Sequence, residues 1–466
     1  MPTPLNRPIQ LSAAPETPQG EKKYERVPFG KEMLKQFSFD PEYTNINHGS
    51  FGAFPEPIRD IRRQYMDAVE LSPDIFIRYT YPKLLNKNRL AAARFLDAPD
   101  DTVVLVPNAT TGINTVLRNL EWNKDGKDEI LYFNTIYGSC GNTISYICES
   151  LNHLVNSRGT TLTYPLSDAQ YVDLFKSTIA TSRSLDKRPR LALFDTISSL
   201  PGVRVPFEAL TKVCKEEGIL SLIDGAHGIG HIPLSLRTLA PDFFVSNVHK
   251  WLGVPRGCAV LYVPVENQGM MRSTLPTGHG FKPRDGRIGT KSSLPPSEGS
   301  EFVGAYEMVG SIDSTPYLTI SASIKWRLQA CGGEEAIRTY CIDLAHRGGQ
   351  LVADILGTYI LDNEEHTMTN CCMTNVLLPL NTKPISSNSA EGNYHLVKAD
   401  HDVEIVEWMQ KTVIDDHKMF IPVYFMQGRW WTRLSAQVYL EMKDFEWAGR
   451  ALKDLCERVG RGEFLK

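Results

Sequence analysis

The residues S-N-V-H-K-W at 246–251 directly follow a short apolar run that reads as a strand. A lysine placed there lies at the rim of a sheet, where burial and cationic neighbours lower its pKa. Lys250 can therefore act both as a nucleophile and as a base. Ser246 and His249 carry donors that suit a phosphate group. A single lysine in a sequence is most often a solvated surface residue. For Lys250, the adjacent Trp251 and the surrounding strands favour a buried position.

A second apolar run, which precedes the first in the chain, ends in I-D-G-A-H-G at 223–228. Asp224 at a strand end can pair with a protonated pyridine nitrogen, which keeps the ring an electron sink for a carbanion. The same aspartate could instead cap the following helix. His227 and His231 are four residues apart, which leaves a metal site open as an alternative, but no third ligand is evident. We therefore expect no metal.

Two further motifs carry polar groups suited to anions. N-A-T-T-G at 108–112 lies between a predicted strand and a predicted helix, and the donors at a helix N-terminus form an anion cradle. Thr110 and Thr111 would hold a phosphate there, although a simple helix cap explains the motif equally well. In W-x-R-L-S-A-Q at 431–437, Arg433 can clamp a substrate carboxylate with two parallel hydrogen bonds. A surface salt bridge is the alternative for Arg433.

Short apolar runs alternate with helical patterns through the middle of the chain. This alternation predicts an α/β fold with a large, mostly parallel sheet. Ligands of such sheets bind at the carboxyl ends of the strands, where the motifs above fall. The predicted strands are 103–106, 129–133, 191–194, 220–223, 243–245 and 259–263, and the predicted helices include 58–70, 83–96, 113–120 and 317–331.

Composition shifts along the chain suggest three parts. Residues 1–27 read as a disordered, proline-rich leader, residues 28–319 as the large domain, and residues 320–466 as a smaller α+β domain. Residues 276–302 are rich in Gly, Pro and Ser and form a long loop, and long loops in compact enzymes are often functional. Residues 382–396 read as a surface loop.

Composition also excludes several functional classes. The net charge of −4 gives no global field for nucleic acid. The nine cysteines are irregularly spaced and odd in number, which favours reduced thiols and a cytoplasmic protein. No apolar run approaches the roughly 18 residues that a membrane span needs. We expect a small-molecule enzyme with neither nucleic-acid nor membrane partners.

The order of these parts resembles the class V aminotransferase family of fold type I, enzymes that depend on pyridoxal 5′-phosphate (PLP). D-G-A-H at 224–227 and S-N-V-H-K-W-L at 246–252 are the most specific matches. The resemblance implies that Lys250 is the Schiff-base lysine. It further implies a homodimer with shared active sites and a small amino-acid substrate.

The resemblance also assigns roles to the other motif residues. Asp224 would pair with the pyridine nitrogen, His227 would reach the ring hydroxyl, and Tyr137 would lie against the cofactor ring. Arg433 would bind the substrate carboxylate. The phosphate contacts would be Thr110, Thr111, Ser246 and His249, with Ser311 reaching the phosphate of the neighbouring subunit.

Four stretches narrow the resemblance to fungal hercynylcysteine sulfoxide lyases, which complete ergothioneine biosynthesis. They are N-H-G-S-F-G at 47–52, I-L-Y-F-N-T-I-Y-G-S-C-G at 130–141, H-K-W-L-G-V-P-R-G-C-A-V at 249–260 and R-L-S-A-Q-V-Y-L-E-M at 433–442. The implied reaction cleaves a Cβ–S bond to release ergothioneine, pyruvate and ammonia. Lys250 would take the Cα proton and Tyr137 would serve the leaving group. Asn47 and His48 would bind substrate, and ordering of the N-H-G-S turn is the alternative for His48.

Other class V reactions remain open at this point. An aminotransferase or an epimerase-like enzyme acting on a small amino acid would need the same motifs. A cysteine desulfurase needs a thiol on a mobile loop, and 276–302 contains no cysteine. Cys140, three residues after Tyr137, could lie near the pocket or be packed in the core.

Overall fold

The computed structural model describes residues 23–284, 295, 297, 299–383 and 394–466. Most of the predicted leader lies outside these residues. Parts of the two predicted loops, at 276–302 and 382–396, lie outside them as well. No helix among the described residues has the length and apolar character needed to cross a bilayer.

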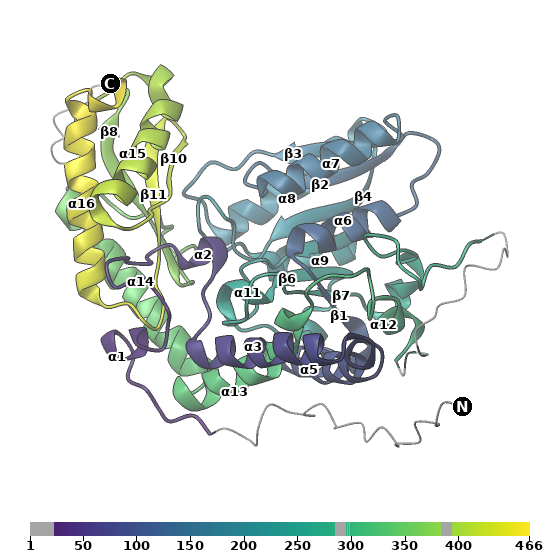
Figure 1. Cartoon of the computed structure of the whole chain (residues 1–466). Helices are drawn as coiled ribbons and strands as arrows, with labels where there is room; N and C mark the ends of the chain where they lie inside the picture. The colour runs from purple at the N-terminus through teal and green to yellow at the C-terminus, as the bar shows by residue number, and fades with distance from the viewer. Residues whose placement is uncertain (1–22, 285–294, 296, 298, 384–393) are drawn as a thin grey trace, which may run out of the picture.

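A mostly parallel sheet forms the larger part of the fold. Its strands are β1 (Val103–Val106), β2 (Asp128–Phe133), β3 (Val155–Thr160), β4 (Arg188–Asp195), β5 (Leu220–Asp224), β6 (Phe243–Asn247) and β7 (Ala259–Tyr262). In the described residues they form a seven-stranded sheet in the order β1-β7-β6-β5-β4-β2-β3 (Figure 1). Strand β7 runs antiparallel to both neighbours and the other pairs are parallel. The predicted α/β fold is confirmed.

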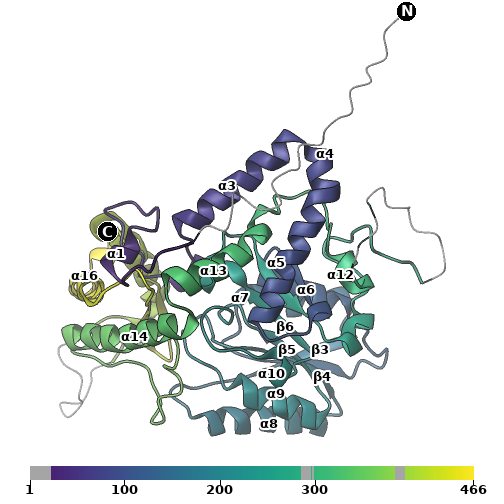
Figure 2. The same cartoon turned by 90° about the horizontal axis from the view of Figure 1, so that it is seen from below.

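Both faces of this sheet are buried, which explains why its strands read as continuous apolar runs. Val103 and Leu105 face one core and Val104 and Val106 face the other. Helices α6 (Ala109–Asn119) and α7 (Gly138–Ser150) cover the second face, and α5 (Tyr81–Phe95), α8 (Asp168–Ser184) and α9 (Phe207–Glu217) cover the first. Figure 2 shows α8 and α9 together along one side of the sheet. Strand β3 was not predicted, because alternate residues of this edge strand are solvated.

Further helices precede the second sheet in the chain. They are α1 (Lys31–Leu34), α2 (His48–Phe51), α3 (Glu56–Leu71), α4 (Pro73–Ile75), α10 (Leu236–Leu239), α11 (Val248–Trp251), α12 (Glu301–Ala305) and α13 (Ile320–Ala330). The predicted helix at 317–331 begins as a 3₁₀ turn, Thr315–Thr319, and continues as α13.

A second sheet forms the C-terminal part. It contains β8 (Met373–Asn381), β9 (His395–Leu396), β10 (Val423–Met426) and β11 (Arg429–Ser435), in the order β10-β11-β8-β9. Helices α14 (Glu334–Leu356), α15 (Asp402–His417) and α16 (Met442–Gly460) pack with it, apart from the larger sheet (Figure 1).

The N-terminal segment packs against this second sheet. Gly30 N–H donates to the Val438 carbonyl at 2.8 Å, and Ser435 N–H donates to the Ile46 carbonyl at 2.8 Å. The predicted boundary at residue 28 groups this segment with the large domain, whereas its hydrogen bonds join it to the small one. The reason is that chain continuity does not decide which core a linker packs against.

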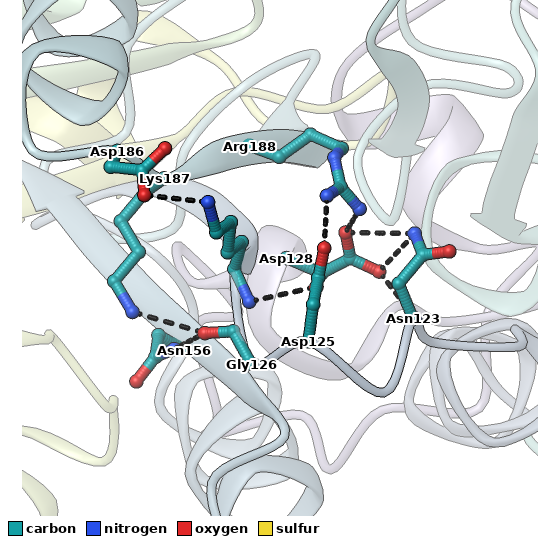
Figure 3. Close-up of polar contacts among 9 residues, drawn as sticks. Asn123, Asp125, Gly126, Asp128, Asn156, Asp186, Lys187 and Arg188 are labelled. Carbon is teal, nitrogen blue, oxygen red and sulfur yellow. Dashed lines mark hydrogen bonds and ion pairs between the residues drawn. The ribbon is translucent and has the colours of Figure 1, made fainter.

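A polar network fixes the turn that precedes β2 (Figure 3). Asp128 is fully buried and accepts hydrogen bonds from the backbone N–H and side-chain amide of Asn123, at 2.8 and 3.0 Å. Arg188, at the start of β4, donates to Asp128 at 2.8 Å and to the exposed Asp125 at 2.5 Å. The network therefore aligns the amino ends of β2 and β4, whose carboxyl ends carry the site described next.

Candidate active site

Lys250 is the third residue of α11, the helix that directly follows β6, and its Nζ is 3.1 Å from His227 Nε2. The indole of Trp251 donates to His227 Nδ1 at 3.0 Å. A neutral His227 must therefore carry its proton on Nε2 and point it at the amine of Lys250. Burial, followed by repulsion from Arg433, lowers the pKa of Lys250 to about 8. Lys250 thus has the lowered pKa that a nucleophilic amine needs near neutral pH.

Asp224 lies at the carboxyl end of β5 and is buried. Its Oδ1 accepts the N–H of Ala226 at 2.9 Å and its Oδ2 accepts the thiol of Cys140 at 3.3 Å. Asp195 lies beside it at the end of β4, since the two are paired in the strand register. Burial raises the pKa of both carboxyls, and the charge of Asp224 raises that of Asp195 further.

The first turn of α6 lies beside the end of β6. Asn108 caps the helix by accepting the N–H and hydroxyl of Thr111, at 2.8 and 3.1 Å. Asn247, next to Val248 of α11, accepts the N–H of Ala109 at 2.9 Å. Thr110 stands in the same turn and is half-buried. The helix N-terminus is therefore tied to the segment that carries Lys250, as an anion cradle for a cofactor would require.

Ser246 and His249, two predicted phosphate contacts, have main-chain partners. The hydroxyl of Ser246 donates to the Gly225 carbonyl and accepts the N–H of Ile229 at 3.0 Å. His249 Nδ1 lies 2.8 Å from the Cys258 carbonyl, so its proton is on Nδ1 and Nε2 keeps its lone pair. Both residues hold the turns around Lys250, and their contact with a phosphate stays a prediction.

Arg433, in the middle of β11, is a buried cation. Its guanidinium donates to the Ser199 carbonyl at 2.7 Å, to Asn47 Oδ1 at 2.9 Å and to Ser50 Oγ at 2.9 Å. Its Nε has no partner, and no carboxylate within the described ranges pairs with it. Burial lowers the pKa of Arg433 to about 10. A buried guanidinium without a counter-ion is the donor set that an incoming carboxylate would satisfy.

The N-H-G-S-F-G motif forms α2, which contacts α11 directly. Gly52 has a φ of +65°, and a Cβ there would lie 2.0 Å from the His249 carbonyl oxygen. His48 is buried, packs against Trp251 and bonds the hydroxyl of Tyr439 at 2.9 Å. These contacts favour the alternative for His48, that it orders the turn. Asn47 does reach the guanidinium of Arg433.

Tyr137 and Ser311 are exposed. Tyr137 precedes α7 and is 47% exposed, at the carboxyl end of the sheet after β2. Ser311 lines a cavity of about 640 Å³ whose lining also includes Pro107, the residue before Asn108. Within the described chain neither residue forms a hydrogen bond with Lys250, so their roles stay predictions.

Several residues of the site were not predicted. Asp195 ends the apolar run L-A-L-F-D just as Asp224 ends L-S-L-I-D, and this shared pattern was its available signal. Cys140 turns out to be both buried and bonded to Asp224. No sequence motif pointed to Ser50 or Ser199, because their role is to accept hydrogen bonds from Arg433 and depends on where Arg433 lies. His227 accepts the indole N–H of Trp251, whereas His231 stacks on the Trp251 ring and accepts the N–H of Cys372. No metal-binding group of three ligands occurs among the residues described.

Comparison with known proteins identifies the family. The model for class V aminotransferases matches residues 79–293. The L-cysteine desulfhydrase-like protein lolT2 of Epichloe uncinata is 39% identical over 93% of this chain and 95% of its own length. The chain belongs to the class V aminotransferase family.

Two further similarities agree with this membership. The hercynylcysteine sulfoxide lyase of Schizosaccharomyces pombe is 30% identical to this chain. The match covers 92% of this chain and 98% of the lyase. The cysteine desulfurase CsdA of Escherichia coli has the same fold, with a TM-score of 0.65 at 16% identity over 91% of this chain and 98% of its own. The predicted fold type and the class V resemblance are confirmed.

This class V chain is a PLP-dependent enzyme of the carbon–sulfur lyase type. The C-DES lyase, known with glycine linked to its PLP cofactor, has a TM-score of 0.66 at 17% identity over 90% of this chain and 98% of its own. The site fits the cofactor: an amine with a lowered pKa, an acid held by two donors and a helix N-terminus meet at one sheet edge. Lys250 would hold the aldehyde, Asp224 the ring nitrogen and the α6 turn the phosphate.

Proposed function

We propose that this enzyme cleaves hercynylcysteine sulfoxide, as the last step towards ergothioneine. Arg433, the buried cation without a carboxylate partner in the described chain, is the observation that carries the proposal of an amino-acid substrate. The match with the hercynylcysteine sulfoxide lyase of Schizosaccharomyces pombe along 92% of the chain supports the sulfoxide.

The residues divide the reaction between them. The bound cofactor supplies an electron sink for the charge that develops at Cα. Arg433 holds the substrate carboxylate, and Lys250 takes the Cα proton. The Cβ–S bond then breaks, and Tyr137 donates a hydrogen bond to the departing sulfenate. The three-carbon fragment takes up water and ends as pyruvate and ammonia. Two equivalents of a thiol reduce the sulfenic acid to the thione, with release of water and a disulfide.

The test is to incubate the purified holoenzyme with hercynylcysteine sulfoxide and with the corresponding thioether, and to follow pyruvate. We expect pyruvate and ergothioneine in equal amounts from the sulfoxide when a thiol reductant is present. Lys250→Ala is the blank. Intact sulfoxide after prolonged incubation would contradict the proposal.

L-cysteine is the second candidate substrate, because the desulfhydrase-like proteins lolT1 and lolT2 are more similar to this chain than the sulfoxide lyase is. Sulfide release from L-cysteine with a higher kcat/KM than the sulfoxide would favour it. A desulfurase is disfavoured because all nine cysteines are buried, whereas a persulfide carrier must be accessible.

We further propose a homodimer in which Ser311 of each subunit serves the site of the other. Large apolar side chains are exposed along α3, α4, the π-helix Phe76–Thr80 and the turn near Ser311. They are Met66, Leu71, Ile75, Tyr79 and Ile312. Contiguous exposed apolar surface is typical of an interaction site. The same segments border the cavity next to Pro107.

A further inference from the structure

Asp195 and Asp224 form a buried carboxyl pair at the carboxyl ends of two adjacent parallel strands. Because they are opposite each other in the register of β4 and β5, their side chains leave the sheet on the same face. Lys250 is the cation whose charge acts on both carboxyls, and within the described residues no ion pair of 4 Å or less joins it to either of them. Two anions here would leave uncompensated negative charge in a region removed from water.

The surroundings of the two carboxyls differ in their donors. Asp224 accepts the Ala226 N–H and the Cys140 thiol. Asp195 has no such donor among the described residues, and the ionisable groups that face it are Asp224, Lys250, Cys140, Tyr164 and Tyr171. Hydrogen-bond donors stabilise a carboxylate more than they stabilise a neutral acid. The negative charge of the pair therefore belongs on the member that holds both donors.

We propose that the pair carries a single negative charge at neutral pH, with the proton resident on Asp195 and the charge on Asp224. Asp195 is then a positioning residue that presents an O–H donor, where a carboxylate could only accept. Cys140 is the second positioning residue, because its thiol keeps the charge on Asp224. This proposal rests on PLP binding alone and is independent of the substrate proposed above.

The proposal makes an asymmetric prediction for two isosteric substitutions. Asp195→Asn replaces one neutral group with another, so the dissociation constant of PLP from the apo-protein should stay within about twofold of wild type. Asp224→Asn removes the charge and should weaken PLP by at least about tenfold. Cofactor absorbance, followed against pH, should overlay for wild type and Asp195→Asn and shift for Asp224→Asn.

Cys140 gives an independent test that leaves both carboxyls in place. Cys140→Ala removes a donor from Asp224 and should weaken PLP measurably, whereas Cys140→Ser keeps a donor and should restore the affinity. Thermal melting of the apo-proteins confirms that each variant is folded.

A difference infrared spectrum of apo-protein reads the proton directly. Wild type should show a protonated-carboxyl stretch that Asp195→Asn lacks. Equal loss of PLP affinity in Asp195→Asn and Asp224→Asn would overturn the assignment, as would a Cys140→Ala variant that behaves like wild type. None of these measurements involves substrate. A failure to release pyruvate from the sulfoxide would therefore contradict the proposed function without affecting this inference.

Discussion

At the scale of one residue, burial changes the chemistry of Lys250 because it lowers the pKa of the side-chain amine. Its amine is close to the proton-bearing Nε2 of His227 and is repelled by the charge of Arg433. Both effects disfavour the ammonium form. Burial, the largest cause, together with the charge of Arg433 lowers the pKa of Lys250 to about 8, so the amine becomes nucleophilic at a lower pH than it would in water.

This lowered pKa predicts the pH dependence of cofactor uptake. Only the neutral amine attacks an aldehyde, so the rate at which apo-protein incorporates PLP should rise with pH and level off above about 8. The folded pKa lies below the unfolded one, so the cost of burying Lys250 should also decrease between pH 8 and roughly 10.4. Stopped-flow absorbance measures the rate, with Lys250→Ala as blank. A midpoint near 10 would show that the amine is solvated.

Arg433 predicts a substrate-binding defect. Arg433→Lys loses the planar fork and cannot keep its three bonds while binding a carboxylate. We expect KM to rise about 30-fold, equivalent to roughly 2 kcal/mol, with a smaller change in kcat. Arg450→Lys, at an exposed ion pair on α16, is the matched control. An unchanged KM for the amino-acid substrate would show that Arg433 does not bind the substrate carboxylate.

At the scale of elements, α2 and α11 are in backbone contact at Gly52. Neither helix reaches two turns, so each depends on this packing for its position. Two separate features require glycine at position 52. Its φ is positive, and the His249 carbonyl lies too close to leave room for a side chain.

Gly52→Ala should therefore displace α11 and weaken PLP binding by at least about tenfold. Gly218 provides the control, because it also has a positive φ, of +67°, but open space around its missing Cβ. Gly218→Ala should lower the free energy of unfolding by about 1 kcal/mol and leave PLP affinity unchanged. Equal effects of the two variants on PLP would mean that backbone strain, not contact with α11, is what matters at Gly52.

The network around Asp128 predicts a second element-scale contrast (Figure 3). Asp128→Ala removes a fully buried carboxylate, the shared acceptor of Asn123 and Arg188, and should cost about 2–4 kcal/mol in urea unfolding of the apo-protein. Asp125→Ala removes only an exposed ion pair with the same Arg188 and should leave the urea unfolding midpoint almost unchanged. Similar losses would contradict the assigned difference in burial.

At the scale of the whole molecule, the site lies between the two sheets. Lys250 and Asp224 come from the larger sheet and Arg433 from the smaller one. A second contact crosses the same boundary, where the Gln427 side chain bonds both the N–H and the carbonyl of Tyr164 at 2.8 Å. The relative position of the sheets therefore sets the distance between cofactor and substrate carboxylate.

The proposed dimer gives a prediction at this scale. Leu71→Glu places a charge on the exposed apolar surface of α3 and should shift the protein from dimer to monomer in light scattering after gel filtration. Leu185→Glu, an exposed leucine after α8, is the matched control and should stay dimeric. A wild type that elutes as a monomer would contradict the dimer itself.

The sequence by itself determined most of the large sheet, with the exception of β3, the motifs at its carboxyl edge and the family. Apolar runs of strand length and the D-G-A-H and H-K-W stretches are local signals, readable without knowing where the chain turns. Tertiary structure decided which groups share an environment. Asp195 beside Asp224, Cys140 on that carboxylate, and Asn47, Ser50 and Ser199 around Arg433 are neighbours across long chain separations. The packing of the N-terminal segment on the small sheet depends likewise on register and burial. Such pairings follow from how the layers pack, and no spacing along the chain records them.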